Sequence, residues 1–174
     1  KKEAEWIVQW MRRHGLNYGR SHGFGLPDPE RWDRMDYFIH QCKQAGIYLV
    51  LTPVYWTEFE ITDPEGNQVR TSSHVILFFN NNMEQAVREL WKEFYTHRNP
   101  YTGLRYADDP TLAAFEFKNE DSPFWALNWI KNGLPVFWKE IQRQYSGFLR
   151  EKYRTTDALR RAVQEGKVVP PRIL

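Results

Sequence analysis

The sequence has a single cysteine, Cys42, among its 174 residues, which excludes an intrachain disulfide. Cys42 lies at helical spacing among apolar residues, and this predicts a buried structural thiol rather than a nucleophile. No apolar stretch approaches the roughly 20 residues that cross a bilayer. The first five residues are typical of a helix start and not of a signal peptide, so the compartment stays open, with a secreted or periplasmic location among the possibilities.

The sequence also lacks a dominant charge. Its 24 basic and 22 acidic side chains nearly cancel and are interspersed, which argues against nucleic acid or an anionic membrane as a partner. The five histidines show no metal-ligand spacing with one another or with acids, and there is no glycine-rich phosphate loop or serine elbow. The sequence therefore predicts a function without a metal, a nucleotide or another cofactor.

Aromatic residues, in contrast, are abundant. The chain contains 8 Trp, 9 Tyr and 11 Phe, together 16% of its residues. Most of these rings are expected in the core, because aromatic side chains dominate core burial. Tryptophans in loops are an exception, since their flat faces suit the C–H faces of a sugar ring.

The spacing of apolar residues and the capping signals predict five helices. The first helix ends at Gly15, and the second runs from Asp28-Pro29 to Gly46. The third is capped by Asn82 and ends before Asn99-Pro100. The fourth begins near Pro135, and a short fifth helix is capped by Thr155.

Three segments between these helices are predicted as strands, namely residues 16–24, 47–54 and 112–117. Residues 56–79 have no helical period and contain the turn signal Pro64-Glu65-Gly66-Asn67, so they are interpreted as one long loop. Alternation of helices and strands predicts an α/β fold with a parallel sheet. Three parallel strands alone leave two hydrophobic edges unpaired, which natural proteins avoid.

The prediction for the whole chain is therefore one partial domain, residues 1–174, of a (β/α)8 TIM barrel. It would comprise roughly strands 2–4 with their flanking helices, since a complete barrel has about 250 residues. A self-contained flavodoxin-like domain is the alternative fold, and it would need additional strands from residues 56–79.

In such a barrel, function resides at the carboxyl ends of the strands. Glu120, near aromatics and beside another carboxylate, is the candidate proton donor, with a solvated loop acid as the alternative. Asn119 is a candidate for binding a sugar hydroxyl or for orienting Glu120, with turn capping as the alternative. Glu116 is a candidate structural acid paired with Arg20 or Lys118. The further candidates for substrate binding, each with a structural alternative, are Arg20, His22 and two tryptophans expected in loops, Trp56 and Trp125.

Residues 109–120 read DPTLAAFEFKNE, with Asn119-Glu120 directly after a strand, and Arg20 lies at the end of an earlier strand. This pattern, together with residues 148–162, resembles glycoside hydrolases of clan A, the cellulase-like and β-galactosidase-like (β/α)8 enzymes. The resemblance implies that Glu120 is the general acid/base, that Asn119 contacts the sugar 2-hydroxyl and that Arg20 supports the nucleophile.

Members of this clan are retaining enzymes whose nucleophilic carboxylate comes from the seventh strand, which this chain does not contain. The expected function is therefore hydrolysis of O-glycosidic bonds in a poly- or oligosaccharide, as in polysaccharide degradation. The chain would supply the acid/base, would be inactive alone, and would have a carbohydrate and the remainder of the barrel as partners. The alternative is a barrel-derived protein that binds carbohydrate without cleaving it.

Overall fold

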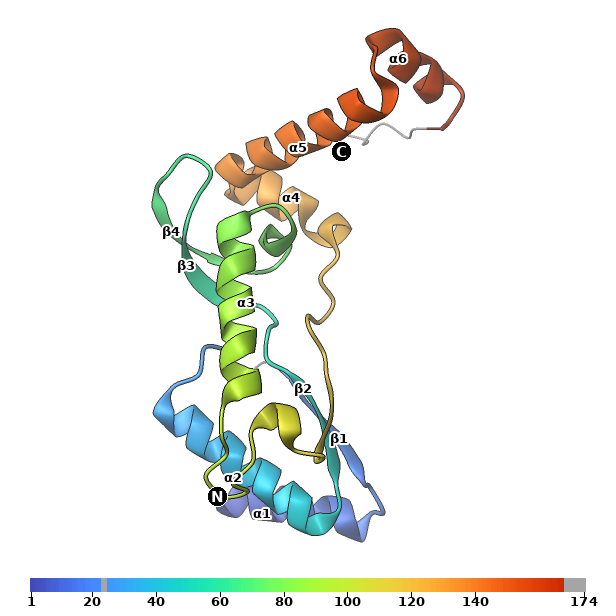
Figure 1. Cartoon of the computed structure of the whole chain (residues 1–174). Coiled ribbons are helices and arrows are strands. Elements are labelled where there is room, and N and C mark those ends of the chain that lie inside the picture. Colours follow the sequence, from blue (N-terminus) through green and yellow to red (C-terminus); the bar gives the residue numbers. More distant parts are fainter. Residues whose placement is uncertain (23–24, 168–174) are drawn as a thin grey trace. The chain divides into compact units, whose positions relative to one another are not determined.

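The computed structural model of the chain describes residues 1–22 and 25–167. Its contacts divide into two compact units, Lys1–Leu127 and Asn128–Leu174. The first unit holds both sheets and the residues proposed for function (Figure 1).

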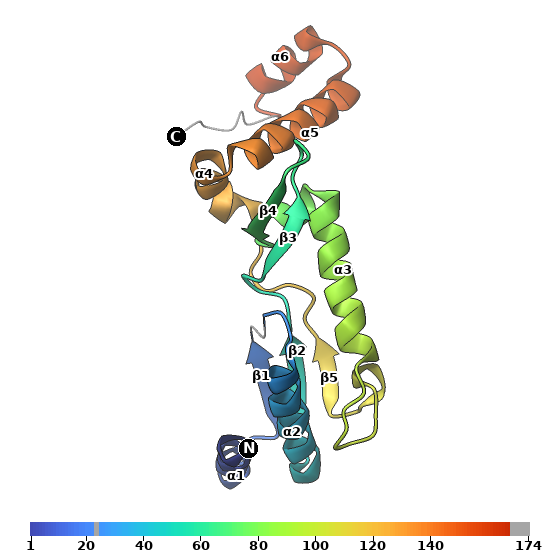
Figure 2. The same ribbon diagram turned by 90° about the vertical axis from the view of Figure 1, so that its left-hand side faces the viewer.

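A three-stranded sheet is the centre of the first unit. It consists of β1 (Tyr18–His22), β2 (Tyr48–Thr52) and β5 (Leu112–Phe115), in the order β1-β2-β5. All three strands run parallel, as Figure 2 shows, so the predicted α/β fold with a parallel sheet is confirmed. The strands are shorter than predicted, and residues 23–24 of the first predicted strand lie outside the described residues.

Two helices accompany this sheet, α1 (Lys2–Arg13) and α2 (Pro29–Ala45), and they pack against each other. The predicted caps of α2 are confirmed. The Asp28 carboxylate accepts a hydrogen bond from the backbone N–H of Arg31 at 2.8 Å. Gly46 ends the helix in the left-handed conformation, with φ 68°, which is accessible to glycine without a Cβ clash.

The core beneath the sheet is apolar and closely packed. Ile39 and Cys42 of α2 and Leu49 and Leu51 of β2 are at most 1% exposed. Burial raises the pKa of the Cys42 thiol to about 12, which keeps it protonated and unreactive at neutral pH. The predicted buried structural thiol is therefore confirmed.

The interpretation of residues 56–79 as one long loop is wrong. They contain an antiparallel hairpin, β3 (Glu58–Thr62) and β4 (Gln68–Ser72), followed by the short 3₁₀ helix η1 (Ile76–Phe78). In β3, Phe59 and Ile61 are buried while Glu58 and Glu60 are exposed. This period-2 alternation is the strand signal that the turn-rich composition of the segment obscures.

Helix α3 (Asn81–Thr96) has the apolar side that its spacing predicts, with Val87 and Phe94 fully buried. Its cap is Asn80 and not Asn82. The Asn80 Oδ1 accepts a hydrogen bond from the Met83 N–H at 2.9 Å, whereas Asn82 is the second residue of the helix and its exposed side chain donates to the Thr62 carbonyl at 2.7 Å. Three consecutive asparagines, residues 80–82, make the capping position ambiguous in sequence.

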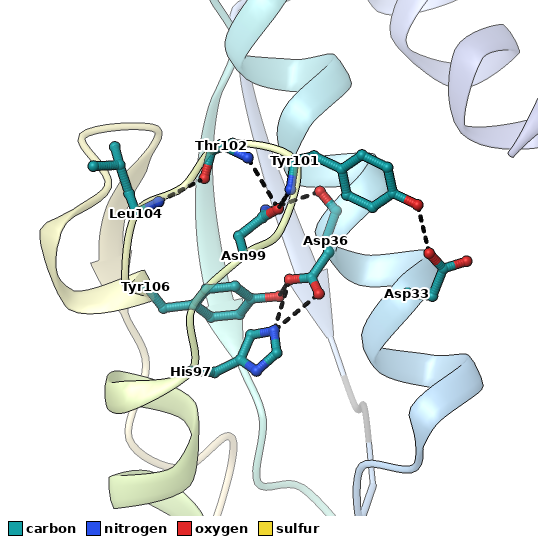
Figure 3. Close-up of polar contacts among 8 residues, drawn as sticks. All are labelled: Asp33, Asp36, His97, Asn99, Tyr101, Thr102, Leu104 and Tyr106. Carbon is teal, nitrogen blue, oxygen red and sulfur yellow. Dashed lines mark hydrogen bonds and ion pairs between the residues drawn. The ribbon is translucent and has the colours of Figure 1, made fainter.

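A buried aspartate connects α2 to the segment that follows α3 (Figure 3). The Asp36 carboxylate, 3% exposed, accepts hydrogen bonds from the Tyr106 hydroxyl and from His97 Nε2, both at 2.9 Å. The Asn99 amide donates to the Asp36 carbonyl at 2.9 Å. Burial raises the pKa of Asp36, and the bonds from His97 and Tyr106 act in the opposite direction. Tyr106 is the first residue of the 3₁₀ helix η2 (Tyr106–Asp108), so this network fixes the segment that leads into β5.

In the part of the chain after β5 that the structure describes, there are three helices. Helix α4 (Pro123–Gly133) crosses the boundary between the two units, and α5 (Pro135–Tyr153) and α6 (Thr156–Gln164) belong to the second. The last two are confirmed predictions, and the Thr155 hydroxyl caps α6 by accepting from the Ala158 N–H at 3.1 Å. Helix α4 is absent from the sequence prediction. None of the helices in the described residues combines the length and the apolar character needed to cross a membrane.

Candidate functional site

Four polar side chains meet at the carboxyl edge of the parallel sheet, and we call them the arginine cluster. Arg20 Nη2 donates to Glu116 Oε2 at 2.5 Å and to Asn119 Oδ1, and Arg20 Nε donates to Thr52 Oγ1 at 3.3 Å. The Thr52 hydroxyl in turn donates to Glu116 Oε2 at 2.5 Å. The cluster therefore joins the ends of all three parallel strands. Of the two partners predicted for Glu116, it is Arg20 and not Lys118 that pairs with it.

Glu120 follows this cluster directly along the chain. Asn119 is 5% exposed, and the bond from Arg20 fixes its amide. Glu120, in contrast, is exposed, and among the described residues its carboxylate has neither a hydrogen bond nor an ion pair. Its backbone has φ 43°, a conformation that non-glycine residues adopt rarely. The structure thus holds the residue before the acid and leaves the acid itself accessible to a ligand.

Two of the predicted binding residues share an aromatic neighbour, Tyr55, in the segment after β2. The His22 ring lies edge-on to Tyr55, with centroids 4.6 Å apart, and the Trp56 ring is perpendicular to Tyr55 at 6.1 Å. Trp56 also stacks on His74, with centroids 4.1 Å apart and an interplanar angle of 17°. Since Trp56 is 50% exposed, one part of the ring is covered and the other is open to solvent.

The prediction that Trp125 lies in a loop is wrong, because Trp125 belongs to the first turns of α4. Pro123 opens this helix, a placement that suits a proline because the first helical N–H groups have no intrahelical acceptor. Trp125 is nevertheless 67% exposed, and its neighbour Phe124 is 82% exposed. Among the described residues, Trp125 has no ring contact or side-chain hydrogen bond with the other predicted site residues.

A buried group of charges that the sequence reasoning missed lies next to Glu120, and we call it the lysine cluster. Lys118 Nζ donates to the Tyr55 carbonyl and, at 3.2 Å, to Ser73 Oγ, and it lies 3.4 Å from Asp121 Oδ2. His74 Nδ1 lies 3.0 Å from Asp121 Oδ1. The side chains of Lys118, Asp121 and His74 are all at most 5% exposed.

Desolvation controls the titration of the lysine cluster. Burial lowers the pKa of Lys118, and the attraction of Asp121 acts in the opposite direction. Burial also lowers the pKa of His74, with Lys118 adding to the effect and Asp121 opposing it. The position of Lys118 and Asp121 on either side of Asn119-Glu120 is a signal for this cluster in the sequence. His74 lacks such a signal, because it follows a hairpin whose strand pattern is obscured by turn-forming residues.

The depressed pKa of His74 predicts a loss of stability in acid. Below pH 6.5 the unfolded chain protonates this imidazole while the folded chain resists protonation, so the free energy of unfolding falls as the pH falls. The His74→Gln variant should lose less stability than the parent between pH 7.5 and pH 5.5, with a difference of at most about 1.4 kcal/mol per pH unit. Urea unfolding of both proteins at the two pH values measures this, and equal losses would contradict it.

The described residues contain no group of three or more His, Cys, Asp or Glu side chains arranged to hold a metal ion. At this edge of the sheet, an exposed carboxylate, Glu120, follows an amide that a guanidinium fixes. Such an arrangement can transfer a proton and bind hydroxyl groups.

No protein-family model and no curated protein matches the chain. Solved structures, however, share its fold. An endo-β-1,4-mannanase from Thermotoga petrophila is 17% identical with a TM-score of 0.54, over 74% of this chain and 35% of that one. An endo-1,4-β-mannanase from Rhizomucor miehei is 18% identical with a TM-score of 0.52, over 80% of this chain and 49% of that one. The chain thus spans at most about half the length of these glycoside hydrolases, and at such identities the similarity shows the fold alone.

Proposed function

We propose that this chain is part of a (β/α)8 barrel and supplies the general acid/base, Glu120, of a retaining β-glycosidase. The observation that carries the proposal is the arginine cluster. Arg20 binds the side chain of Asn119, so the residue before Glu120 is held at the carboxyl edge of a parallel sheet, where barrel enzymes have their active sites. The fold similarity to two mannanases supports the same conclusion.

In this proposal each predicted site residue has a role. Glu120 donates a proton to the leaving glycosidic oxygen and later removes one from the attacking water. Asn119 binds the sugar 2-hydroxyl, and Arg20 supports the nucleophilic carboxylate that another strand contributes. The flat, half-exposed ring of Trp56 stacks against a sugar, and His22 and Trp125 add further contacts to the substrate.

The remainder of the barrel is the partner that the proposal requires. Within the described residues, β1 and β5 each pair only with β2, so both edges of the parallel sheet are open. Large apolar side chains in this part of the chain are exposed: Tyr18 of the edge strand β1 by 56%, Tyr48 of β2 by 52%, and Trp6 and Trp10 of α1 by 64% and 44%. Exposed apolar surface together with unpaired strand edges suits further β/α units packing against this part of the chain.

The experiment that tests the proposal is hydrolysis by the full-length protein of a panel of β-1,4-linked oligosaccharides, beginning with mannooligosaccharides. Cleavage should release a product whose anomeric configuration is initially β, as a double displacement requires, and NMR of the first product measures this. An initially α product would contradict the retaining mechanism. Binding of the panel without cleavage would favour the non-catalytic carbohydrate-binding alternative.

A further inference from the structure

The two residues that flank the proposed Asn119-Glu120 pair are buried ions. The Lys118 and Asp121 side chains are 5% and 2% exposed, and ionisable side chains are almost never buried to this extent unless they are paired. They have each other as counter-charges, with Lys118 Nζ 3.4 Å from Asp121 Oδ2. Burying such a pair costs the desolvation free energy of both ions, which can exceed the attraction between them. A gain in the free energy of unfolding is therefore not a sufficient reason for burying this pair.

Lys118 connects the segment after β5 to two other segments. Its ammonium donates to the Tyr55 carbonyl, which follows β2, and to Ser73 Oγ, which follows β4. The Ser73 hydroxyl donates to the same Tyr55 carbonyl at 3.2 Å. The residue two positions before Glu120 is therefore anchored to both the parallel sheet and the hairpin.

Asp121 connects two strained backbone positions. Glu120 has φ 43° and Val75 has φ 63°, and a β-branched residue such as valine is a genuine outlier at positive φ. The Asp121 Oδ1 accepts a hydrogen bond from the Val75 N–H at 2.7 Å. Backbone strain of this kind persists only where the surroundings enforce it, and it occurs preferentially at functional sites.

Glu120 itself contributes nothing to its own placement among the described residues. Its carboxylate is exposed and without a polar partner there, while Arg20 holds Asn119 on one side and Val75 holds Asp121 on the other. The direction in which the acid projects is therefore set by its neighbours along the chain.

We propose that Asp121, paired with Lys118, is a positioning residue that holds Glu120 in its left-handed backbone conformation, with the carboxyl group at the carboxyl edge of the sheet. This inference rests on the proposed function. The lysine cluster would keep the proton donor within reach of the leaving oxygen. A displacement of about 1 Å at such a donor costs about 10²-fold in rate.

The test compares D121N and E120Q in the full-length protein. D121N keeps the size of the side chain and an oxygen acceptor for the Val75 N–H, but it removes the charge that faces Lys118. D121N leaves Lys118 as a buried ion without its counter-charge, and the double variant K118M/D121N removes both charges and so avoids this effect. Circular dichroism and unfolding midpoints establish the folded fraction of each variant, and D108N, at an exposed aspartate paired with Arg105, is the matched control.

The readout is kcat/KM for an unactivated β-glycoside and for a dinitrophenyl β-glycoside, whose leaving group needs no proton. We expect D121N and K118M/D121N to lower the first about 10- to 100-fold and to leave the second within about threefold, because a misplaced donor affects only leaving groups that require protonation. A merely structural role would lower both values by the same factor.

Three outcomes are distinguishable. Leaving-group-dependent losses in both E120Q and D121N support the inference. A leaving-group-dependent loss in E120Q, with D121N either like the parent or uniformly impaired, overturns the inference while the proposed function stands. Parent-like activity of E120Q overturns the proposed function, and the inference with it.

Discussion

Glu120→Gln in the full-length protein should lower kcat/KM for an unactivated β-glycoside by about 10² to 10⁴, the range that loss of a general acid causes. Glutamine has nearly the size of glutamate but cannot donate a proton to the leaving oxygen. A dinitrophenyl glycoside should form the glycosyl-enzyme almost as fast as with the parent, because its leaving group is stable as an anion. Hydrolysis of that intermediate should slow, because the base that activates water is also absent.

Pre-steady-state kinetics measures both effects. E120Q should release a burst of dinitrophenolate equal to the enzyme concentration, followed by slow turnover. Glu60→Gln is a suitable control, since Glu60 is an exposed carboxylate on β3 that belongs to neither the arginine cluster nor the lysine cluster. Parent-level kcat/KM of E120Q on the unactivated glycoside would remove Glu120 from the role of acid.

Asp36→Ala should lower the free energy of unfolding by about 2 to 6 kcal/mol, because two donors lose a buried acceptor and each such loss costs about 1 to 3 kcal/mol. The substitution deprives the Tyr106 hydroxyl and His97 Nε2 of their common acceptor (Figure 3). Tyr106 is 1% exposed, so water cannot readily replace the lost bond. The loosened segment precedes β5, and the expected result is a lower urea midpoint for the first unit.

Asp33→Ala is the matched control for this prediction. Asp33 lies one turn earlier on α2 and also accepts a hydrogen bond from a tyrosine hydroxyl, that of Tyr101, at 2.5 Å. Its side chain, however, is 49% exposed, and its ion pair with Lys1 at 3.4 Å is at the surface. A loss of at most about 1 kcal/mol is therefore expected. Similar losses for the two variants would mean that burial does not determine the strength of the Asp36 network.

The parallel sheet can be predicted from the sequence, because its strands lie between well-marked helices. Asp28 and Gly46 give unambiguous ends to α2, and continuous apolar runs mark β2 and β5. The pairing of Glu116 with Arg20, one of the two partners predicted for this acid, also follows from this reasoning, since parallel strands bring their carboxyl ends to one edge. In these places local propensity and tertiary packing favour the same structure.

The hairpin and α4 could not be predicted in the same way. The short strand of Phe59 and Ile61 offers only two buried positions, too few to stand out beside the turn that follows. Aromatic residues such as Phe124 and Trp125 are exposed in α4, so they do not form the apolar stripe that indicates a helix. Lys118 contacts Ser73, which directly follows the hairpin. Because the sequence predicts a loop in place of the hairpin, it does not predict the lysine cluster.

The β3–β4 hairpin has a consequence for changing substrate preference. Segments that follow a barrel strand are suitable sites for grafting new recognition loops, because they tolerate insertions and lie at the carboxyl end of the barrel, where substrates bind. In this protein Ser73 and Val75, immediately after β4, bind the side chains of Lys118 and Asp121. Under the proposed function, a graft that replaces the hairpin would alter selectivity and proton delivery together, unless the transplanted loop retains the backbone of residues 73–75.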